Sequence, residues 1–316
     1  MSKITQFARD WTLVIAIIAG IVSYVVYIQL PLPASAHSIT NRVISAAQPA
    51  LIFAMLFLTF SRIDPRSLRP RMWHLWLLLI QGGLFAAIGC VLMLMPDTGF
   101  RVPLEGTMIL LICPTATAAA VITKKLHGDI NDITTYTILI NLLATLLIPA
   151  FQPLVHPTPG TTFTTSALLI LGKVFPLLLL PLISAQLVRM LLPRINHMIA
   201  ARQELSFYLW AVALTIAIAV TTRSLYHTHT TLSTQLWLVV TSLLACLFQF
   251  WAGRRIGSHY GATVTAGQAM GQKNTVLAIW VGYTFFTPVT AIAGGFYSIW
   301  HNVINTMQLR RANHAR

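Results

Sequence analysis

Apolar stretches long enough to cross a lipid bilayer recur along almost the entire chain. A helix needs about twenty apolar residues to cross the hydrocarbon core. Only 9% of the residues are charged, 56% are hydrophobic, and the mean hydropathy is +0.73. The sequence therefore predicts an all-α membrane protein with ten transmembrane helices, near residues 11–30, 43–60, 75–95, 106–122, 133–155, 167–190, 205–222, 236–251, 260–285 and 290–307.

The positively charged residues of the chain sort to one side of this arrangement. With the N-terminus in the cytoplasm, Arg42, Arg101 and Arg223 fall outside the cell, and Lys173 and Lys273 fall within spans. Cytoplasmic segments of membrane proteins carry an excess of Lys and Arg. We therefore expect a multi-pass protein of the bacterial inner (plasma) membrane with both termini in the cytoplasm, and the net charge of +14 indicates topology rather than nucleic-acid binding. The residues on the cytoplasmic side are Lys3, Arg9, Arg62, Arg66, Arg69, Arg71, Lys124, Lys125, Arg189, Arg194, Arg202, Arg254, Arg255, Arg310, Arg311 and Arg316.

The first apolar stretch also has some features of a signal peptide. Lys3 and Arg9 precede it, and the segment from Ala34 to Ala36 is similar to a signal-peptidase site. The apolar core of a signal peptide has about 7–15 residues, however, and this stretch is longer. We therefore predict that the first span is retained and that residues 1–316 form a single membrane domain.

The ten predicted spans divide into two sets of five, residues 11–155 and 166–308, joined by an uncharged linker rich in Pro, Gly and Thr. An odd number of spans in each set makes the second set enter the membrane from the opposite side, as in the inverted repeats of many secondary transporters. The fourth span of each set is interrupted by polar residues and helix breakers. Since unwound backbone in a membrane must be buried or line a cavity, we expect discontinuous helices 4 and 9 to cross.

The fourth span is interrupted between Cys113 and Ala120. Pro114 has no amide proton, and its ring clashes with the preceding turn, so the helix should break near Cys113. The break leaves a half-helix whose N-terminal amide groups favour an anion, and Thr115 and Thr117 can add hydroxyl groups. The alternative is that Pro114 only kinks a closely packed span.

The ninth span is interrupted by the polar run Thr265–Thr275, which contains two glycines and Lys273. A charge at mid-membrane depth costs about 2.5–3.5 kcal/mol on insertion scales, so an intramembrane lysine is by default a functional residue. The alternative is a structural lysine that donates to carbonyl groups of the facing break. Lys173 lies close enough to the outer end of its span for its charge to reach the interface.

Motifs for other chemistries are absent from the sequence. There is no zinc-protease motif, no hydrolase nucleophile elbow and no phosphate-binding loop. None of the seven acidic residues falls deep in a predicted span. We therefore expect neither an enzyme nor a bound cofactor.

The chain resembles a known transporter family over nearly its full length, and three sequence blocks carry the resemblance. The first covers residues 113–123 and continues to Gly128 and Asp129, the second covers residues 271–278, and the third covers residues 296–302. They are similar to the Cys-Pro-Gly-Gly-Thr-Ala-Ser-Asn run, the Glu-x-Gly-x-Gln-Asn motif and the Phe-Ser-x-Trp-His-Asn motif of the bile acid:sodium symporter family. This family is part of the larger bile, arsenite and riboflavin transporter group.

The resemblance implies that helices 1, 2, 6 and 7 form a panel, that helices 3–5 and 8–10 form a core, and that organic anions are taken up with two sodium ions. The chain departs from the family at the implied sodium ligands. Ala119 and Ala120 stand at the family's Ser-Asn pair, Ala269 replaces its acidic ligand, and Lys273 replaces its glutamine. Sodium is a hard cation that needs several oxygen ligands. A one-residue shift aligns Gln272 with the glutamine but does not restore the acid.

We therefore expect a secondary active or facilitative transporter of a small organic anion, in which Lys273 supplies the positive charge that sodium supplies in relatives. Transport would be independent of sodium, with or without proton coupling. The alternatives are an ordinary sodium-coupled organic anion symporter, an oxyanion efflux permease of the arsenite type that uses Cys113, and a membrane sensor that does not transport. The predicted substrate or ion site comprises Gln81, Thr115, Thr117, Thr137, Gln268, Gln272, Lys273, Asn274 and Thr275.

Overall fold

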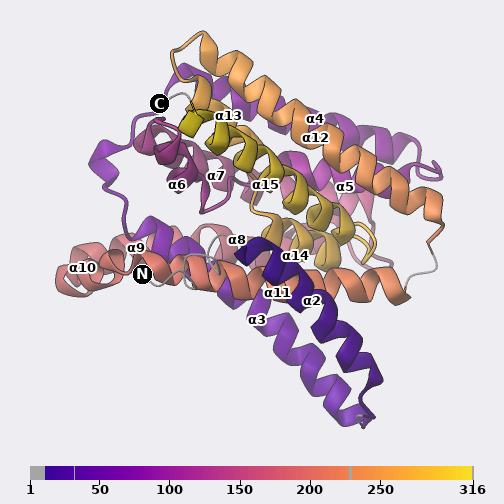
Figure 1. Ribbon diagram of the computed structural model, residues 1–316. Helices are drawn as coiled ribbons and strands as arrows, with labels where there is room; N and C mark the ends of the chain where they lie inside the picture. The colour runs from indigo at the N-terminus through magenta and orange to yellow at the C-terminus, as the bar shows by residue number, and fades with distance from the viewer. Residues whose placement is uncertain (1–10, 32, 228–229, 315–316) are drawn as a thin grey trace.

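The computed structural model describes residues 11–31, 33–227 and 230–314, and their regular elements are helices (Figure 1). In chain order these are α2 (Thr12–Gln29), α3 (Ala34–Phe60), η1 (Pro65–Ser67), α4 (Met72–Leu94), α5 (Arg101–Ile112), α6 (Ala119–Lys125), α7 (Ile130–Val155), α8 (Phe163–Leu178), α9 (Leu180–Leu191), α10 (Pro193–Ala201), α11 (Gln203–His227), α12 (Leu232–Ser258), α13 (Thr263–Gly271), α14 (Thr275–Phe285) and α15 (Ala291–His314).

Five helices of the described chain are long and apolar enough to cross a membrane by themselves. They belong to α3, α4, α7, α11 and α12, and the bent pair of α8 and α9 provides a sixth candidate. The remaining predicted spans correspond to α2, to α15, and to the pairs α5–α6 and α13–α14, which do not pass the same test of length and hydropathy. The prediction of an all-helical protein with several membrane-length helices is therefore confirmed at this coarser level.

Helix α3 begins earlier than the sequence predicted. We expected a span from residue 43, because the polar residues Thr40, Asn41 and Arg42 interrupt the apolar pattern. The helix instead begins at Ala34, directly after Pro33, and Pro49 lies within it. The segment that is similar to a signal-peptidase site is thus the first turn of a helix.

The span predicted over residues 167–190 is not one straight helix. Helices α8 and α9 meet at Leu179 with a bend of 41°. Pro181 lies in the first turn of α9, where it has no amide proton to donate to α8, and its ring clashes with the carbonyl group of the preceding turn. Sequence reasoning missed this bend because residues 174–183 around it are all apolar and read as one continuous span.

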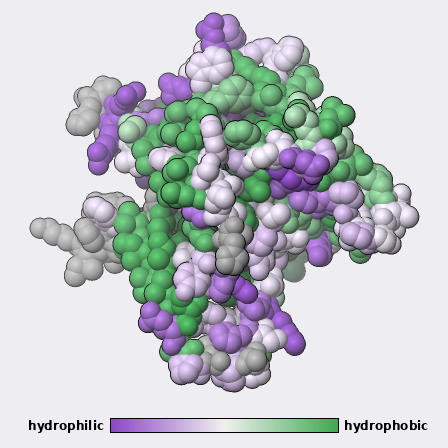
Figure 2. All heavy atoms as spheres, turned by 90° about the vertical axis from the view of Figure 1, so that its right-hand side faces the viewer, coloured by the Kyte–Doolittle hydropathy of each residue, from purple (hydrophilic) through white to green (hydrophobic). Residues whose placement is uncertain are grey.

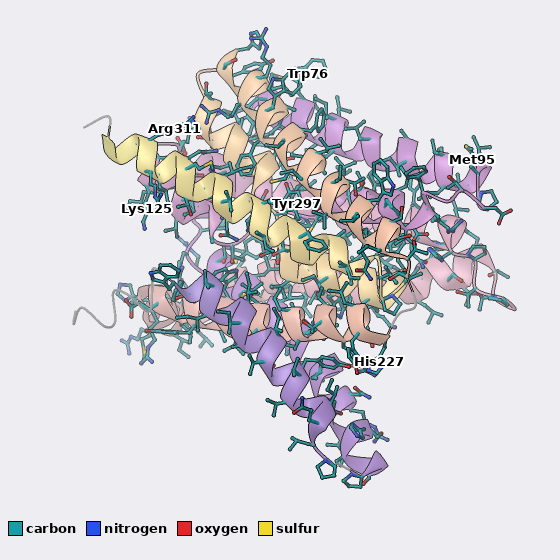
Figure 3. The ribbon with its side chains drawn as sticks, turned by 45° about the vertical axis from the view of Figure 1, so that its right-hand side comes forward. Trp76, Met95, Lys125, His227, Tyr297 and Arg311 are labelled. Atoms are coloured by element: carbon teal, nitrogen blue, oxygen red, sulfur yellow. The ribbon has the colours of Figure 1, made fainter. Side chains whose placement is uncertain are left out.

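The helices form two layers in Figure 1. Helices α4, α5, α12, α13 and α15 lie in one layer, and α2, α3 and α8 to α11 lie in the other. In Figure 3, Lys125 and Arg311 lie near one end of the molecule, and Met95 and His227 lie near the opposite end. Hydrophobic residues cover much of the face shown in Figure 2, as expected for a surface in contact with lipid.

Close packing between α12 and α13 fixes the position of the ninth predicted span. A Cβ atom added to Gly253 would lie 2.4 Å from the carbonyl oxygen of Ala266, and one added to Gly257 would lie 2.6 Å from that of Ala262. Only glycine permits such an approach of two backbones. The first part of α13 is therefore held closely against α12.

Candidate functional site

The two predicted breaks are present, and the structure brings them together. Helix α5 ends at Ile112 and α6 begins at Ala119, while α13 ends at Gly271 and α14 begins at Thr275. The two unwound segments lie antiparallel, with a β-bridge between Thr115 and Lys273. We call this pair of segments, residues 113–118 and 272–274, the crossing.

Backbone hydrogen bonds join the two segments of the crossing. The Ala116 amide donates to the Gln272 carbonyl oxygen at 2.8 Å, and the Asn274 amide donates to the Pro114 carbonyl oxygen at 2.9 Å. An unpaired buried backbone group is costly, and water is absent from the bilayer core. Each unwound segment therefore supplies the hydrogen-bond partners that the other loses by leaving the helix.

Particular residues enforce these breaks. Pro114 cannot donate within a helix, and a Cβ atom on Gly271 would lie 2.4 Å from the Phe250 ring. Asn274 starts α14, since its side-chain oxygen accepts from the Leu277 amide at 3.2 Å. Pro114 and the polar, glycine-containing run around Asn274 are local and were readable from the sequence, which is why the positions of the breaks were predicted. The contact between Gly271 and Phe250 depends on the fold.

Two side chains of the first segment fasten it to the second. The Thr115 hydroxyl donates to the Ala269 carbonyl oxygen at 2.6 Å, and the Cys113 thiol donates to the Asn274 carbonyl oxygen at 3.0 Å. Both side chains are buried. Thr115 is therefore part of the framework of the crossing.

Lys273 lies in the middle of the crossing and is 1% exposed. Its amine donates to the Leu111 carbonyl oxygen at 3.1 Å. Leu111 belongs to the last turn of α5, where carbonyl groups lack intrahelical partners and the helix dipole is negative. None of the ion pairs among the described residues involves Lys273. The partner of its amine is therefore a helix end rather than a carboxylate.

A buried hydrogen-bond network surrounds the same carbonyl group. Gln81 of α4 donates to the Leu111 oxygen at 2.8 Å and to the side-chain oxygen of Gln249 at 3.1 Å, and it accepts from Tyr136. Gln249 donates to the Tyr297 hydroxyl at 3.1 Å, and this hydroxyl donates to the Gly271 carbonyl oxygen at 2.8 Å. The network joins both helix ends at the crossing to α4, α7, α12 and α15.

Three members of this network were missed as site residues by sequence reasoning. Gln249 is a lone amide in an apolar span, which is a usable signal, because an unpaired amide in a membrane is costly. Tyr136 and Tyr297 were not separable from ordinary core aromatic residues. Their roles depend on neighbours that only the fold brings near.

The other predicted site residues are distributed around the crossing. Gln272 is buried, and its side-chain oxygen has no hydrogen-bond partner among the described residues. Gln268 is turned toward α15, where it donates to Asn305 and Gln308 at 3.0 Å each. Thr137 donates to the Ile133 carbonyl oxygen of its own helix at 2.8 Å. Thr117 is half-buried in the first segment, and Thr275 is buried at the start of α14.

The positions implied as lost sodium ligands also lie at the crossing. Ala119 is the first residue of α6, and Ala269 lies in the last turn of α13; both are buried. Ala120 follows in α6 and is half-buried. At these three positions the side chains offer methyl groups and no oxygen ligand.

A second buried polar cluster lies beyond the crossing, and the sequence analysis did not identify it. Glu105 of α5 is fully buried and pairs with Arg101 at 2.9 Å and with His156 at 2.7 Å. It also accepts from the Thr290 hydroxyl at 3.1 Å. The cluster ties the start of α5 to the end of α7 and to the link before α15. We placed Glu105 just before its span, so its burial was not anticipated.

No protein-family model matches the chain, and no curated protein matches it. The resemblance to bile acid:sodium symporters thus stays a prediction carried by three sequence blocks. The geometry at the crossing is an independent basis for a proposal about function.

Proposed function

We propose that this protein is a membrane transporter of a small organic anion, and that the amine of Lys273 takes the place of a coupling cation. One observation carries the proposal: a fully buried lysine amine donates to the C-terminal carbonyl end of one broken helix, inside the crossing with another. Intramembrane charges of this kind mark substrate and ion pathways. Broken helices in corresponding halves of a transporter mark the binding site.

The polar groups near Lys273 support a site without sodium. The Thr115 hydroxyl and the Gln81 amide both donate to backbone carbonyl groups. Ala119 and Ala269 contribute methyl groups at their positions. A sodium ion beside the ammonium group would also be repelled by it. The protein therefore transports its substrate without sodium under this proposal.

Alternating access follows from the two layers of the fold. In the conformation described here Lys273 is closed off from both sides, so the layers must shift relative to each other before an anion meets the amine. The bound anion then neutralises the charge of the amine. With this neutral pair bound, the protein changes from one open state to the other. If the amine releases its proton during the cycle, transport is coupled to protons; if it stays charged, the protein is a uniporter or exchanger.

Uptake by proteoliposomes tests the proposal. A thermal-shift screen of bile acids, oxo acids, sulfonates and pantoate-like acids identifies a ligand, because a molecule that binds only the folded state raises its stability. Uptake of that acid should be equal in sodium and choline media. Binding without uptake would indicate a sensor, and strict sodium dependence of uptake would indicate an ordinary sodium symporter.

A pair of lysine variants tests the role of the amine. Lys273→Ala should weaken binding of the identified acid by about 1.5–3 kcal/mol, the worth of a hydrogen bond to a charged group. Lys173→Ala is the matched control, since Lys173 is exposed and its amine lies 5.9 Å from the Phe285 ring centroid. Undiminished binding by Lys273→Ala would overturn the proposal.

We also propose the complete membrane arrangement: ten helices in two inverted repeats, in a bacterial inner membrane, with both termini in the cytoplasm. The separation of Lys125 and Arg311 from Met95 and His227 in Figure 3 supports it, as does the positive-inside rule. A reporter fused after Arg316 should be located in the cytoplasm, and one inserted within residues 161–165 should be located outside the inner membrane. The opposite pattern would contradict the inverted repeats.

A further inference from the structure

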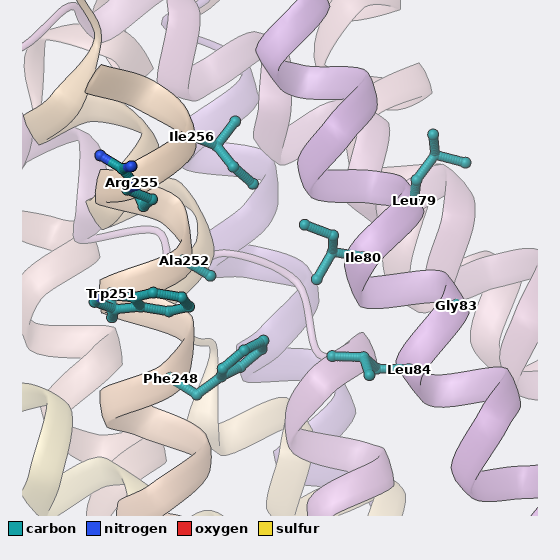
Figure 4. A pocket seen from close by; sticks show the side chains of 9 residues that line it. All are labelled: Leu79, Ile80, Gly83, Leu84, Phe248, Trp251, Ala252, Arg255 and Ile256. Atoms are coloured by element: carbon teal, nitrogen blue, oxygen red, sulfur yellow. The ribbon is translucent and has the colours of Figure 1, made fainter. Parts of the chain in front are cut away.

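The surface of the molecule carries a hollow of about 500 Å³ between α4 and α12 (Figure 4). Leu79, Ile80 and Leu84 line it from α4, and Phe248 and Trp251 line it from α12. Their side chains are apolar, so the wall of the hollow has the chemistry of a hydrocarbon site rather than of a path for an organic anion.

The hollow opens toward the membrane. Leu79 is 54% exposed and Trp251 is 63% exposed, although both belong to membrane-length helices. Gly83 of α4 also lines the groove, and a Cβ atom added there would meet no other atom within 4 Å. The missing side chain therefore widens a groove that lipid reaches directly.

One charged residue marks one end of the groove. Arg255 lines the hollow together with Ile256 and is exposed. Among the described residues no acceptor pairs with its guanidinium group. Trp76 and Tyr260, joined by a hydrogen bond of 3.1 Å, lie beyond this end of the groove. Amphipathic aromatic residues of this kind are enriched where a membrane meets water.

The groove is long enough for the upper part of a lipid tail beneath a head group. Phe248 is two helical turns before Arg255 in α12, which is about 10 Å at 1.5 Å per residue. Arg255 lies on the side of the membrane where the basic residues gather, and this leaflet carries the anionic lipids that attract juxtamembrane arginines. A guanidinium group also binds phosphate by paired hydrogen bonds.

We propose that the groove between α4 and α12 binds an anionic phospholipid of the cytoplasmic leaflet, with one acyl chain on the apolar wall and the phosphate group on Arg255. The site is separate from Lys273: it rests on the proposed orientation in the membrane but not on the proposed transport activity. α4 supplies Gln81 to the crossing and α12 supplies Gln249, so the lipid contacts the two helices whose side chains hold the broken ends.

Native mass spectrometry of the purified protein with phosphatidylglycerol or phosphatidylethanolamine tests this site. The wild type should retain more phosphatidylglycerol. Arg255→Gln should reduce retention of phosphatidylglycerol by about fivefold, since one basic residue near a membrane contributes about 1 kcal/mol to the attraction of anionic lipid. Its retention of phosphatidylethanolamine should not change.

Two further variants complete the test. Gly83→Leu fills the groove and should reduce retention of both lipids, while Arg69→Gln, which removes an exposed arginine outside the groove, should change neither. Equal retention of both lipids by the wild type would overturn the proposal. So would an unchanged preference for phosphatidylglycerol in Arg255→Gln or unchanged retention in Gly83→Leu.

Discussion

Replacement of Lys273 by methionine separates a functional lysine from a structural one, because the two roles predict opposite results. Methionine has nearly the length of lysine but lacks the charge and the donors. Its sulfur can occupy the buried space of the amine, and the Leu111 carbonyl oxygen still accepts from Gln81 at 2.8 Å. The substitution therefore leaves the Leu111 carbonyl oxygen paired.

The magnitudes favour a stable variant. Burial of an ammonium group costs several kcal/mol in real proteins, and the single hydrogen bond to Leu111 returns about 1.5–3 kcal/mol. Apolar replacement of buried charged groups is often neutral or stabilising by about 1–4 kcal/mol. We thus expect Lys273→Met to unfold at the same temperature as the wild type or above it.

The affinity for the identified acid should fall in Lys273→Met, although the stability does not. Loss of the charge-assisted contact of about 1.5–3 kcal/mol corresponds to an affinity about 10-fold to 150-fold lower for the identified acid. Thermal unfolding of the purified protein, with and without that acid, measures both quantities in one series. Lys173→Met is the control and should alter neither. A strongly destabilised Lys273→Met would show that the lysine is a structural part of the crossing, and an undiminished ligand shift would refute its role in binding.

Three further changes test other parts of the structure. Glu105→Gln removes the charge of a buried carboxylate that pairs with the partly exposed Arg101, and a hydrogen bond to a charged group is worth about 1.5–3 kcal/mol, so the unfolding midpoint should fall; an unchanged midpoint would show that the cluster is dispensable. Gly253→Ala places a Cβ atom 2.4 Å from a backbone oxygen of α13 and should lower the free energy of unfolding by about 1–3 kcal/mol. In the control, Gly172→Ala, the new Cβ atom meets nothing within 4 Å. Equal unfolding midpoints for the two variants would contradict the packing of α12 on α13. Cys113→Ser keeps a donor for its backbone acceptor and should retain most uptake; abolished uptake by a folded protein would favour the oxyanion permease.

The sequence was sufficient to locate the two breaks because local chemistry determines them. Pro114 and Gly271 act within their own turns or against one neighbour, and a lysine in an apolar span is conspicuous by itself. A carbonyl group of the facing break was named as the partner in the alternative of a structural lysine, and the contact with the Leu111 oxygen matches it. Which carbonyl group it would be could not be read, since any residue type supplies one. The burial of Glu105 was missed for a related reason: its partners His156 and Thr290 come from distant segments.

The start of α3 and the bend between α8 and α9 were also not predicted from the sequence. The polar residues at the start of α3 concealed nine helical residues, because hydropathy measures affinity for lipid rather than helix formation. The bend at Leu179 depends on a proline in a stretch with no polar residue to draw attention to it.

The backbone pairing at the crossing has a consequence for how such a chain can change over generations. Each unwound segment holds the other's amide and carbonyl groups, through the bonds from Ala116 and Asn274. A mutation that restored a continuous helix in one span would strand polar backbone groups of the other span in a medium without water. The two interruptions must therefore be inherited or lost together, because the backbone pairing constrains both spans at once.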